Sequence, residues 1–324
     1  MTIGIRLALV LVGLALAGPA QAQSYPTRTV TIVVTSAAGG LTDVLTRAVG
    51  QRLAQMWNQA VVIENRGGAG HNLAATAVKS AAPDGYTLLA TEAGMFTTQP
   101  HLSPKDKMSY DAATDFVPIA GFASIPMALL ANPAVPANSV REVIALAKEK
   151  TGAVSYGTAG IGTAPHMGAL QLESLAGVKM TAVHYRGASP ALNDVIAGHI
   201  NIITMGPSIA LPTVRAGKLK MLGFGSVKRM PQFPDVPTIA ESIPGYEAGV
   251  SFGLFGLAAM PRELVAKINA DVQKILSDAA FRERFLEPQV VEPVPGSSEA
   301  YANFIRTESA KWSKIVRDAN LKIE

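Results

Sequence analysis

The sequence contains no cysteine, which excludes disulfide bonds and thiol catalysis. It also has little charge and few aromatic side chains: 16% of the residues are charged, 6% are aromatic, and the basic residues are spread along the chain. Nucleic-acid-binding surfaces need clustered Lys and Arg, so we expect no nucleic-acid partner. Beyond its N-terminus the chain has no uncharged apolar run of about 18 residues, the length that a membrane-spanning helix requires. We therefore expect a globular protein with a large buried core.

Signatures of catalysis and of cofactor binding are missing as well. The five histidines are His71, His101, His166, His184 and His199. None belongs to a His-x-x-x-His pair or has a glutamate partner at ligand spacing, so we predict no metal site. No serine lies in a Gly-x-Ser-x-Gly turn, and no glycine-rich stretch matches a dinucleotide or phosphate-binding fingerprint. We therefore predict no cofactor and no enzymatic activity, and an enzyme of unknown chemistry stays the alternative class.

The N-terminus has the pattern of a secretory signal peptide. Arg6 is followed by an uncharged apolar run over residues 7–18 and then by Ala20-Gln21-Ala22, which matches the small-x-small pattern of a signal-peptidase site. We predict a signal peptide over residues 1–22, cleavage after Ala22 and export to the periplasm. Loss of this segment removes Arg6 and no acid, which lowers the formal charge from +4 to +3. This weak positive charge is no more than a mild bias toward small anions.

The central motif is a strand, a glycine turn and a helix start within residues 29–43. Its first half is dominated by β-branched residues, Ser-Ala-Ala-Gly-Gly follows at 36–40, and Thr42 and Asp43 open an amphipathic run. Ser36, Thr42 or Asp43 can cap the helix, and the glycines expose backbone amides beyond the end of the strand. The loop therefore suits an anion or a carbonyl group.

Two more predicted strands run into glycine-rich turns. At 61–72, Val-Val-Ile-Glu leads into Asn-Arg-Gly-Gly-Ala-Gly-His-Asn, and at 154–166, Val-Ser-Tyr leads into Gly-Thr-Ala-Gly-Ile-Gly-Thr-Ala-Pro-His. A lone loop of this kind is usually a turn that binds nothing. Three such loops indicate a binding region, because consecutive βα units bring the ends of their strands to one edge of a sheet.

Three polar residues at such turns are candidate ligand contacts. Glu92 follows a strand predicted over 86–90 and can face a pocket, although a solvated or arginine-paired loop acid is the alternative. Arg186 lies between a predicted strand and a predicted helix, where it can pair with a ligand carboxylate. His166 opens a helix and is either a ligand donor or a satisfied cap or surface residue.

The order of the elements predicts two α/β lobes that share a cleft. The proline-interrupted segment at 114–126 and the stretch at 244–250 indicate two crossings of the chain between the lobes. We expect the apolar strands at 200–203 and 219–224 to be buried and parallel. The apolar and aromatic stripe of the last helix, 298–319, indicates core packing and not a ligand platform. Small ligands commonly bind between two such lobes.

Several segments together resemble the Bug-type, TctC-like substrate-binding proteins of tripartite tricarboxylate transporters, and the resemblance covers essentially the whole mature chain. The segments in the first half are Tyr25-Pro26, Gly39-Gly40 with Thr42-Asp43, residues 62–70 and residues 82–89. Those in the second half are Gly162-Thr163 with His166, Tyr185-Arg186-Gly187, Ala216-Gly217-Lys218-Leu219, residues 234–238 and Phe252-Gly253-Leu254-Phe255. Each segment alone is a weak signal, but the set is specific.

The resemblance implies a type II periplasmic-binding fold, in which two doubly wound α/β lobes enclose a ligand cleft. It places residues 24–124 and 247–324 in lobe 1 and residues 125–246 in lobe 2. It also implies a receptor that closes over a small organic carboxylate and delivers it to the membrane subunits of a tripartite transporter, and we expect a monomer. A periplasmic enzyme acting on a small carboxylate, or a sensor subunit for a signalling partner, is the alternative function.

The resemblance further implies that the ligand is held by backbone amides, hydroxyl groups and waters from the loops at 36–43 and 158–166. With the candidates above, the expected ligand-binding residues are Ser36, Ala37, Ala38, Gly39, Gly40, Thr42, Asp43, Asn72, Glu92, Ala93, Thr158, Gly162, Thr163, His166, Arg186 and Met205.

Three departures from the family pattern bear on the ligand. Ser36-Ala37-Ala38 stands where the family usually has an aromatic residue and two prolines. Residues 92–96 replace a loop rich in hydroxyl groups, and Met205-Gly206 replaces an Asp-Asn pair. We therefore expect a roomier, less polar pocket with one extra acid. The ligand predicted from it is a carboxylate with an apolar or aromatic body, or one whose amine or hydroxyl group faces Glu92, rather than citrate.

Overall fold

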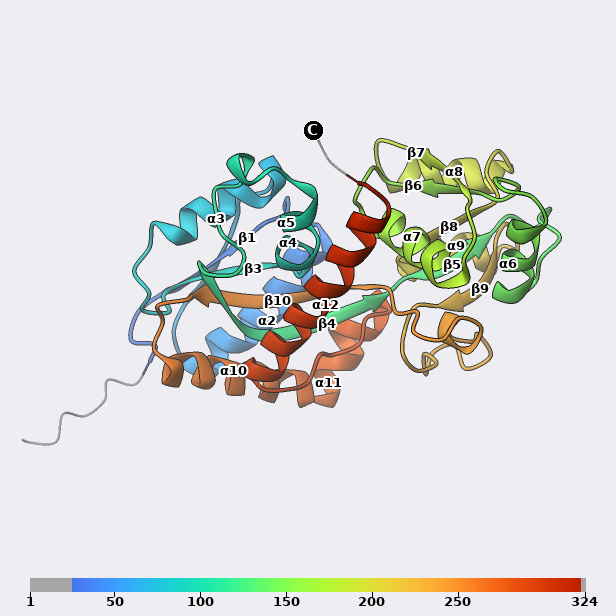
Figure 1. Ribbon diagram of the computed structural model, residues 1–324. Helices are drawn as coiled ribbons and strands as arrows, with labels where there is room; N and C mark the ends of the chain where they lie inside the picture. Colours follow the sequence, from blue (N-terminus) through green and yellow to red (C-terminus); the bar gives the residue numbers. More distant parts are fainter. Residues whose placement is uncertain (1–24, 322–324) are drawn as a thin grey trace, which may run out of the picture.

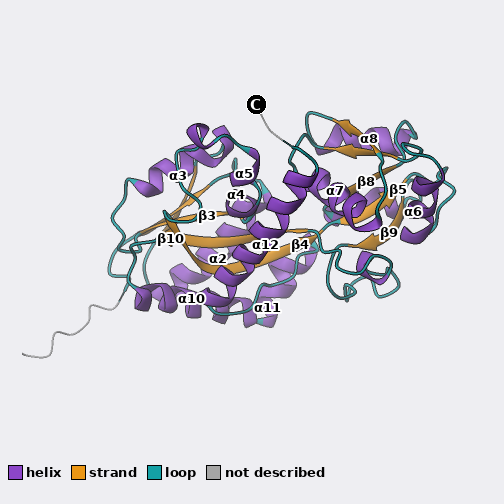
Figure 2. Cartoon of the chain, viewed as in Figure 1, coloured by secondary structure: helices purple, strands orange, loops and turns teal. Residues whose placement is uncertain are grey.

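The computed structural model describes residues 25–321, which form two α/β lobes side by side (Figures 1 and 2). The signal peptide predicted at residues 1–22, with its cleavage site, lies outside the described residues. Within residues 25–321, no helix combines the length and the apolar character that crossing a membrane demands.

Lobe 1 is built on a five-stranded mixed sheet with the order β2-β1-β3-β10-β4. Its strands are β1 (Val30–Val34), β2 (Val61–Asn65), β3 (Thr87–Glu92), β4 (Phe116–Pro126) and β10 (Gly249–Leu257). The strands β1, β2 and β3 are parallel, and β10 runs antiparallel to both β3 and β4. The β-branched side chains of β1 are buried, as the sequence pattern predicts.

Helices cover both faces of this sheet (Figure 1). One face carries α2 (Leu41–Trp57), α10 (Arg262–Ser277) and the short α11 (Ala279–Phe281). The other carries α3 (Asn72–Lys79), α4 (Gly94–Thr97), α5 (Gln99–Leu102) and α12 (Ser298–Asp318). The parallel strands therefore end at one edge, where the loops that enter α2, α3 and α4 lie together.

Lobe 2 repeats this plan with the strand order β7-β6-β8-β5-β9. Its strands are β5 (Ala128–Ala131), β6 (Ser155–Thr158), β7 (Thr181–His184), β8 (Ile202–Met205) and β9 (Lys220–Phe224). Its helices are α6 (Val140–Glu149), α7 (Ala164–Ala176), α8 (Ala188–Ala197) and α9 (Pro207–Arg215). Local helix signals set these boundaries: the Ser139 side chain accepts from the amide of Glu142 at the start of α6, and Gly198 ends α8 with a φ of 80°.

The expectation of parallel strands is wrong for residues 219–224. Strand β9 pairs with β5 in the sheet, and that pairing is antiparallel. Strand β8 is parallel to β6 but antiparallel to β5. An apolar run shows that a strand is buried on both faces, whereas its direction depends on the neighbour that it meets in space.

The chain passes between the lobes at two adjacent points. Strand β4 leads into β5 through Met127, and β10 begins directly after Ala248. The amide of Met127 donates to the Ala248 carbonyl at 3.0 Å, and the amide of Gly225 donates to the Met127 carbonyl at 2.7 Å. A Cβ at Gly225 would lie 2.3 Å from the Ala248 carbonyl oxygen, so only glycine fits there. The two crossings thus form one short, hydrogen-bonded connection, next to the lobe boundaries predicted after residues 124 and 246.

Helix α12 makes a third connection between the lobes. Its first half packs on the sheet of lobe 1, where Tyr301 and Ile305 are buried. In its second half, Trp312, Ile315 and Val316 form a separate buried cluster with residues of α7 and α5; the partners are Met167, Leu170 and Leu102. The end of α12 therefore joins lobe 1 to the first turns of α7 in lobe 2 (Figure 1).

Candidate functional site

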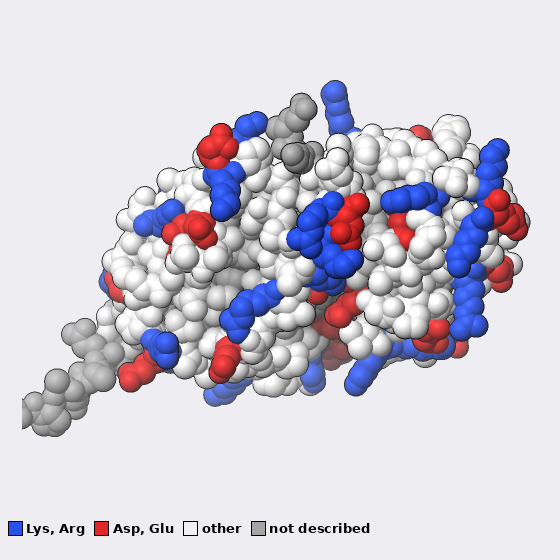
Figure 3. All heavy atoms as spheres, in the orientation of Figure 1, with Lys and Arg blue, Asp and Glu red and all other residues white. Residues whose placement is uncertain are grey.

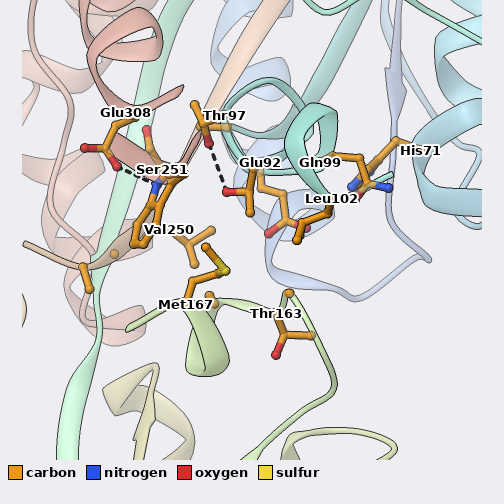
Figure 4. A pocket seen from close by; sticks show the side chains of 18 of the residues that line it. His71, Glu92, Thr97, Gln99, Leu102, Thr163, Met167, Val250, Ser251 and Glu308 are labelled. Carbon is orange, nitrogen blue, oxygen red and sulfur yellow. Dashed lines mark hydrogen bonds between the residues drawn. The ribbon is translucent and has the colours of Figure 1, made fainter. Parts of the chain in front are cut away.

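A cavity of about 420 Å³ lies between the two lobes (Figure 4). Its walls come from the end of β3 with α4 and α5, the start of α7, the first residues of β10 and one side of α12. Four of the expected ligand-binding residues line it: Glu92, Ala93, Gly162 and Thr163. A larger hollow of about 850 Å³ is lined by lobe 1 alone, against α5 and α12. The smaller cavity is the candidate site, because both lobes build it and its volume suits a small molecule.

Lobe 1 brings a carboxylate and an imidazole to this cavity. Glu92 ends β3 and points inward (Figure 4), and its carboxylate has no hydrogen bond or ion pair with any residue in 25–321. The neighbouring His71 has a buried Nδ1 without a hydrogen-bond partner and a left-handed backbone with a φ of 71°. Burial lowers the pKa of His71 below its ordinary value, against the opposing effect of the Glu92 charge. His71 is therefore neutral at pH 7 and does not balance Glu92.

Lobe 2 presents the start of α7. The turn from Ile161 to Ala164 lines the cavity, and Thr163 is the N-cap residue of the helix. No side chain caps this end, so the first backbone amides of α7 have no acceptor within the helix. The positive end of the helix dipole adds to these free donors, and this wall therefore favours an anion.

His166 lies behind this turn and shapes it. The ring is buried with 2% of its surface exposed, and Nδ1 accepts from the amide of Gly162 at 3.0 Å. The rings of Tyr156 and His184 pack beside it, with centroids 6.3 and 4.8 Å away. Burial, with a smaller contribution from His184, lowers the pKa of His166 from 6.5 to about 4. His166 does not line the cavity; it is a buried residue with a satisfied Nδ1 that positions the loop.

Helix α12 provides a wall that the sequence interpretation missed. Phe304, Glu308 and Trp312 lie one turn apart and all line the cavity. Trp312 Nε1 donates to Glu308 Oε2 at 3.0 Å, and Lys311 Nζ lies 2.6 Å from Glu308 Oε1. The prediction of core packing is confirmed, since Tyr301 and Trp312 are buried and Phe304 packs against the cluster of Tyr301; Phe304 and Trp312 also line the cavity, which the prediction did not include. An acid between two aromatic residues at spacings of four is the sequence signal that could have identified this wall.

Strand β10 forms the remaining wall. The amide of Ala93 donates to the carbonyl of Ser251 at 2.7 Å, which ties the loop after Glu92 to this strand. Ser251 is 5% exposed, and its Oγ has no hydrogen-bond partner among the described residues. Sequence reasoning also missed Ser251, because nothing local relates residue 251 to residue 93.

The loop expected at the centre of the site, residues 36–43, does not line this cavity. Asp43 is buried behind it and accepts from the Gly39 amide at 2.9 Å, from Asn65 Nδ2 at 2.8 Å and from Arg47 Nε at 3.0 Å. Burial alone would raise the pKa of Asp43, but these hydrogen bonds hold it below its ordinary value. The loop is thus held rigidly from inside, and its residues 37–39 are exposed.

The expected capping of the following helix is wrong. Gly40 is the N-cap residue of α2, and no side chain makes a capping hydrogen bond there. Ser36 Oγ bonds instead to the carbonyl of Ala37 at 3.3 Å. The glycine turn therefore leaves the first amides of α2 uncapped, as at the start of α7.

The other expected contacts lie away from the cavity. The Asn72 side chain hydrogen-bonds to the backbone of Lys107 and Ser109. Thr158 is fully buried, and its hydroxyl group forms a hydrogen bond with Nδ1 of His184 at 2.8 Å. Met205 lies in the core of lobe 2. Arg186 is exposed, and no ion pair involves it within residues 25–321.

Charge is distributed differently inside the cavity and outside it. The lining includes two carboxylates, Glu92 and Glu308, and no described lysine or arginine. On the outer face in Figure 3, basic and acidic side chains are interspersed and form no extended patch of one sign. Across residues 25–321, no three His, Asp or Glu side chains gather in a group that could hold a metal ion.

Two α/β lobes with paired crossings and a small cavity between them define a two-lobe ligand-binding protein. The chain belongs to the tripartite tricarboxylate transporter receptor family, TctC, whose model matches residues 45–321. The resemblance predicted from the sequence motifs is thereby confirmed, and so is the class of receptor as opposed to enzyme.

Relatives support the same conclusion. The chain is 28% identical to protein BugT of Bordetella pertussis over 95% of this chain and 94% of BugT. It is similar to an R. palustris protein solved with adipate, with 32% identity, a TM-score of 0.76 and coverage of 92% of this chain and 100% of that chain. It is also similar to MatC of Rhodopseudomonas palustris with bound malate, with 34% identity, a TM-score of 0.71 and coverage of 90% and 100%. These structures confirm the predicted two-lobe periplasmic-binding fold.

Proposed function

We propose that this chain is a periplasmic solute receptor that binds a small organic carboxylate and delivers it to the membrane subunits of a tripartite tricarboxylate-type transporter. The observation that carries the proposal is the cavity between the lobes, with the uncapped start of α7 as one wall. Two related structures hold adipate and malate, both of which are dicarboxylates. The family is one of transport receptors, which supports delivery to a membrane partner.

The start of α7 is the proposed carboxylate site. Ala164 lines the cavity, and its amide is among the free donors at the helix start. The amide of Gly162 donates to His166, the amide of Thr163 donates to the Gly160 carbonyl, and Pro165 has no amide hydrogen, so the anion meets the amide of Ala164. Backbone donors and a helix dipole bind a carboxylate without a basic side chain, which agrees with the lining found here.

The remaining walls favour an apolar or aromatic ligand body. Leu102, Met167 and Val250 line the cavity beside the aromatic rings of Phe304 and Trp312. Citrate would place three carboxylates in a space that already contains two. The proposed ligand therefore has a single carboxylate at α7 and a less polar remainder. The loop at 36–43 stays in the proposal as a surface that meets the ligand when the lobes approach each other.

A thermal-shift screen tests this ligand class. Aromatic and amphiphilic monocarboxylates should raise the melting temperature, since a ligand present at 100 times its Kd stabilises the folded state by about 2.7 kcal/mol. Citrate should leave it unchanged. Strong stabilisation by citrate with none by the monocarboxylates would contradict the proposal.

Receptor and rival functions differ in what happens to the ligand. A receptor returns one bound ligand per chain chemically unaltered, whereas an enzyme converts many equivalents. Uptake into vesicles that contain the membrane subunits should depend on added receptor. A sensor subunit would instead show ligand-dependent binding to a signalling partner and no effect on uptake.

A further inference from the structure

The cavity is electrically polarised from one lobe to the other. On the lobe 2 side, the start of α7 offers free amides and a positive dipole end. On the lobe 1 side, Glu92 and Glu308 are acidic, and no described lysine or arginine lines the space between them. A ligand that carries opposite charges at its two ends matches both walls, whereas a dicarboxylate matches only one.

The two acids differ in how far their charge is already compensated. Glu308 is paired with Lys311 and bonded to the indole of Trp312. Glu92 has no partner within residues 25–321, and its neighbour His71 is neutral at pH 7 because burial lowers its pKa. An unpaired carboxylate that points into a binding cavity attracts a cationic group, because the ion pair compensates for the hydration that the carboxylate loses when a ligand covers it.

Two further features of the same region fit a cationic group. The His71 Nδ1 is a buried polar atom without a partner among the described residues, and His71 lines the cavity. It can accept a hydrogen bond from an ammonium group or from a water bound to it. The ring of Phe304 lies on the same wall as Glu308, and aromatic faces attract cations; the ring of Trp312 already has Lys311 Nζ 4.5 Å from its centroid.

We propose that the ligand is an amino-carboxylate, whose carboxylate binds at the start of α7 and whose protonated amine faces Glu92. This inference rests on the proposed function and specifies its ligand class. Neither the adipate nor the malate of the related structures has an amine, so the inference separates this chain from those proteins.

Matched ligands test the inference by calorimetric titration. The pairs are 4-aminobutanoate with succinate, 5-aminopentanoate with glutarate and 6-aminohexanoate with adipate. Each pair shares its carbon count and one carboxylate and differs in the group at the far end. The wild-type chain should bind the amino acid of the best-fitting pair at least about tenfold more tightly than the diacid.

The variant Glu92→Gln identifies the responsible residue, because it keeps the shape of the side chain and removes the charge. It should abolish the preference for the amino acid within the pair. Glu149→Gln is the matched control, since Glu149 is exposed on α6, away from the cavity; its preference should equal that of the wild type. The wild-type ranking remains decisive even if Glu92→Gln does not fold.

The outcomes separate this inference from the proposed function. If the diacids bind and the amino acids do not, the carboxylate receptor stands and the amino-carboxylate inference fails. If the preference survives in Glu92→Gln, the assigned role of Glu92 fails. If no carboxylate of any kind binds, the proposed function fails together with the inference.

Discussion

Residues near the cavity fall into two groups with different tasks. Glu92 faces the interior, whereas His166 is buried behind the wall and holds the amide of Gly162. Both were predicted as ligand contacts, because an acid after a strand and a histidine at a helix start look equally available in a sequence. Burial separates them, and burial depends on the packing of Tyr156 and His184 around the ring.

The pH dependence of stability should report on His166. The unfolded chain binds a proton at this histidine near pH 6.5, but the folded chain binds it only near pH 4. Stability is therefore complete above pH 6.5 and falls as the pH drops toward 4, by up to about 3 kcal/mol from this residue. His166→Asn keeps an acceptor for the Gly162 amide and should lose less stability over this window than the wild type.

Urea unfolding at a series of pH values measures this difference. The exposed Gln51 on α2 has no titratable group and provides the control: Gln51→Asn should keep the wild-type slope of stability against pH. Equal slopes for His166→Asn and the wild type would show that His166 is not the buried neutral group described here.

At the scale of elements, local sequence patterns predicted the bounds of helices and strands accurately. The helix predicted at 298–319 is α12 at 298–318, and the strand predicted over 86–90 is β3 at 87–92. Caps, glycine stops and apolar spacing are properties of neighbouring residues, so a sequence reveals them. The direction of β9 and the cavity walls from α12 and β10 depend on segments far apart in the chain, and no local pattern carries that information.

Substitution of Asp43 should loosen the loop between β1 and α2. In Asp43→Asn, the new amide group can no longer accept from all three donors of Gly39, Asn65 and Arg47. We expect the free energy of unfolding to fall by about 2 kcal/mol, because buried donors lose their acceptor. Asp106→Asn, at an exposed position, should change it by less than about 0.5 kcal/mol in the same denaturant titration. Equal stability of the two variants would contradict the assigned role of Asp43.

The whole molecule consists of two lobes with three links: the two strand crossings and α12. The crossings were predicted at 114–126 and 244–250, where prolines interrupt apolar segments. The third link was not predicted, because Trp312 and its cluster partners Met167 and Leu102 come from three separate parts of the chain.

Tryptophan fluorescence should detect ligand in the cavity. The chain has two tryptophans: Trp312 lines the cavity, and Trp57 is packed against Tyr25 with its indole bonded to Asp271. In Trp57→Phe, the remaining emission comes from Trp312 and should shift when a ligand binds. In Trp312→Phe, the same ligand should leave the emission of Trp57 unchanged. A ligand-induced shift confined to Trp312→Phe would place binding outside this cavity.

The position of α12 limits how the solute preference of this protein can evolve. Phe304, Glu308 and Trp312 line the cavity proposed to bind the solute, and Trp312 also packs against α7 of lobe 2. A substitution in α12 that lets the cavity accept a new solute will therefore also change how easily the two lobes move relative to each other. A change of solute at this helix therefore requires a second substitution, at Met167 or Leu170, that restores the packing between α12 and α7.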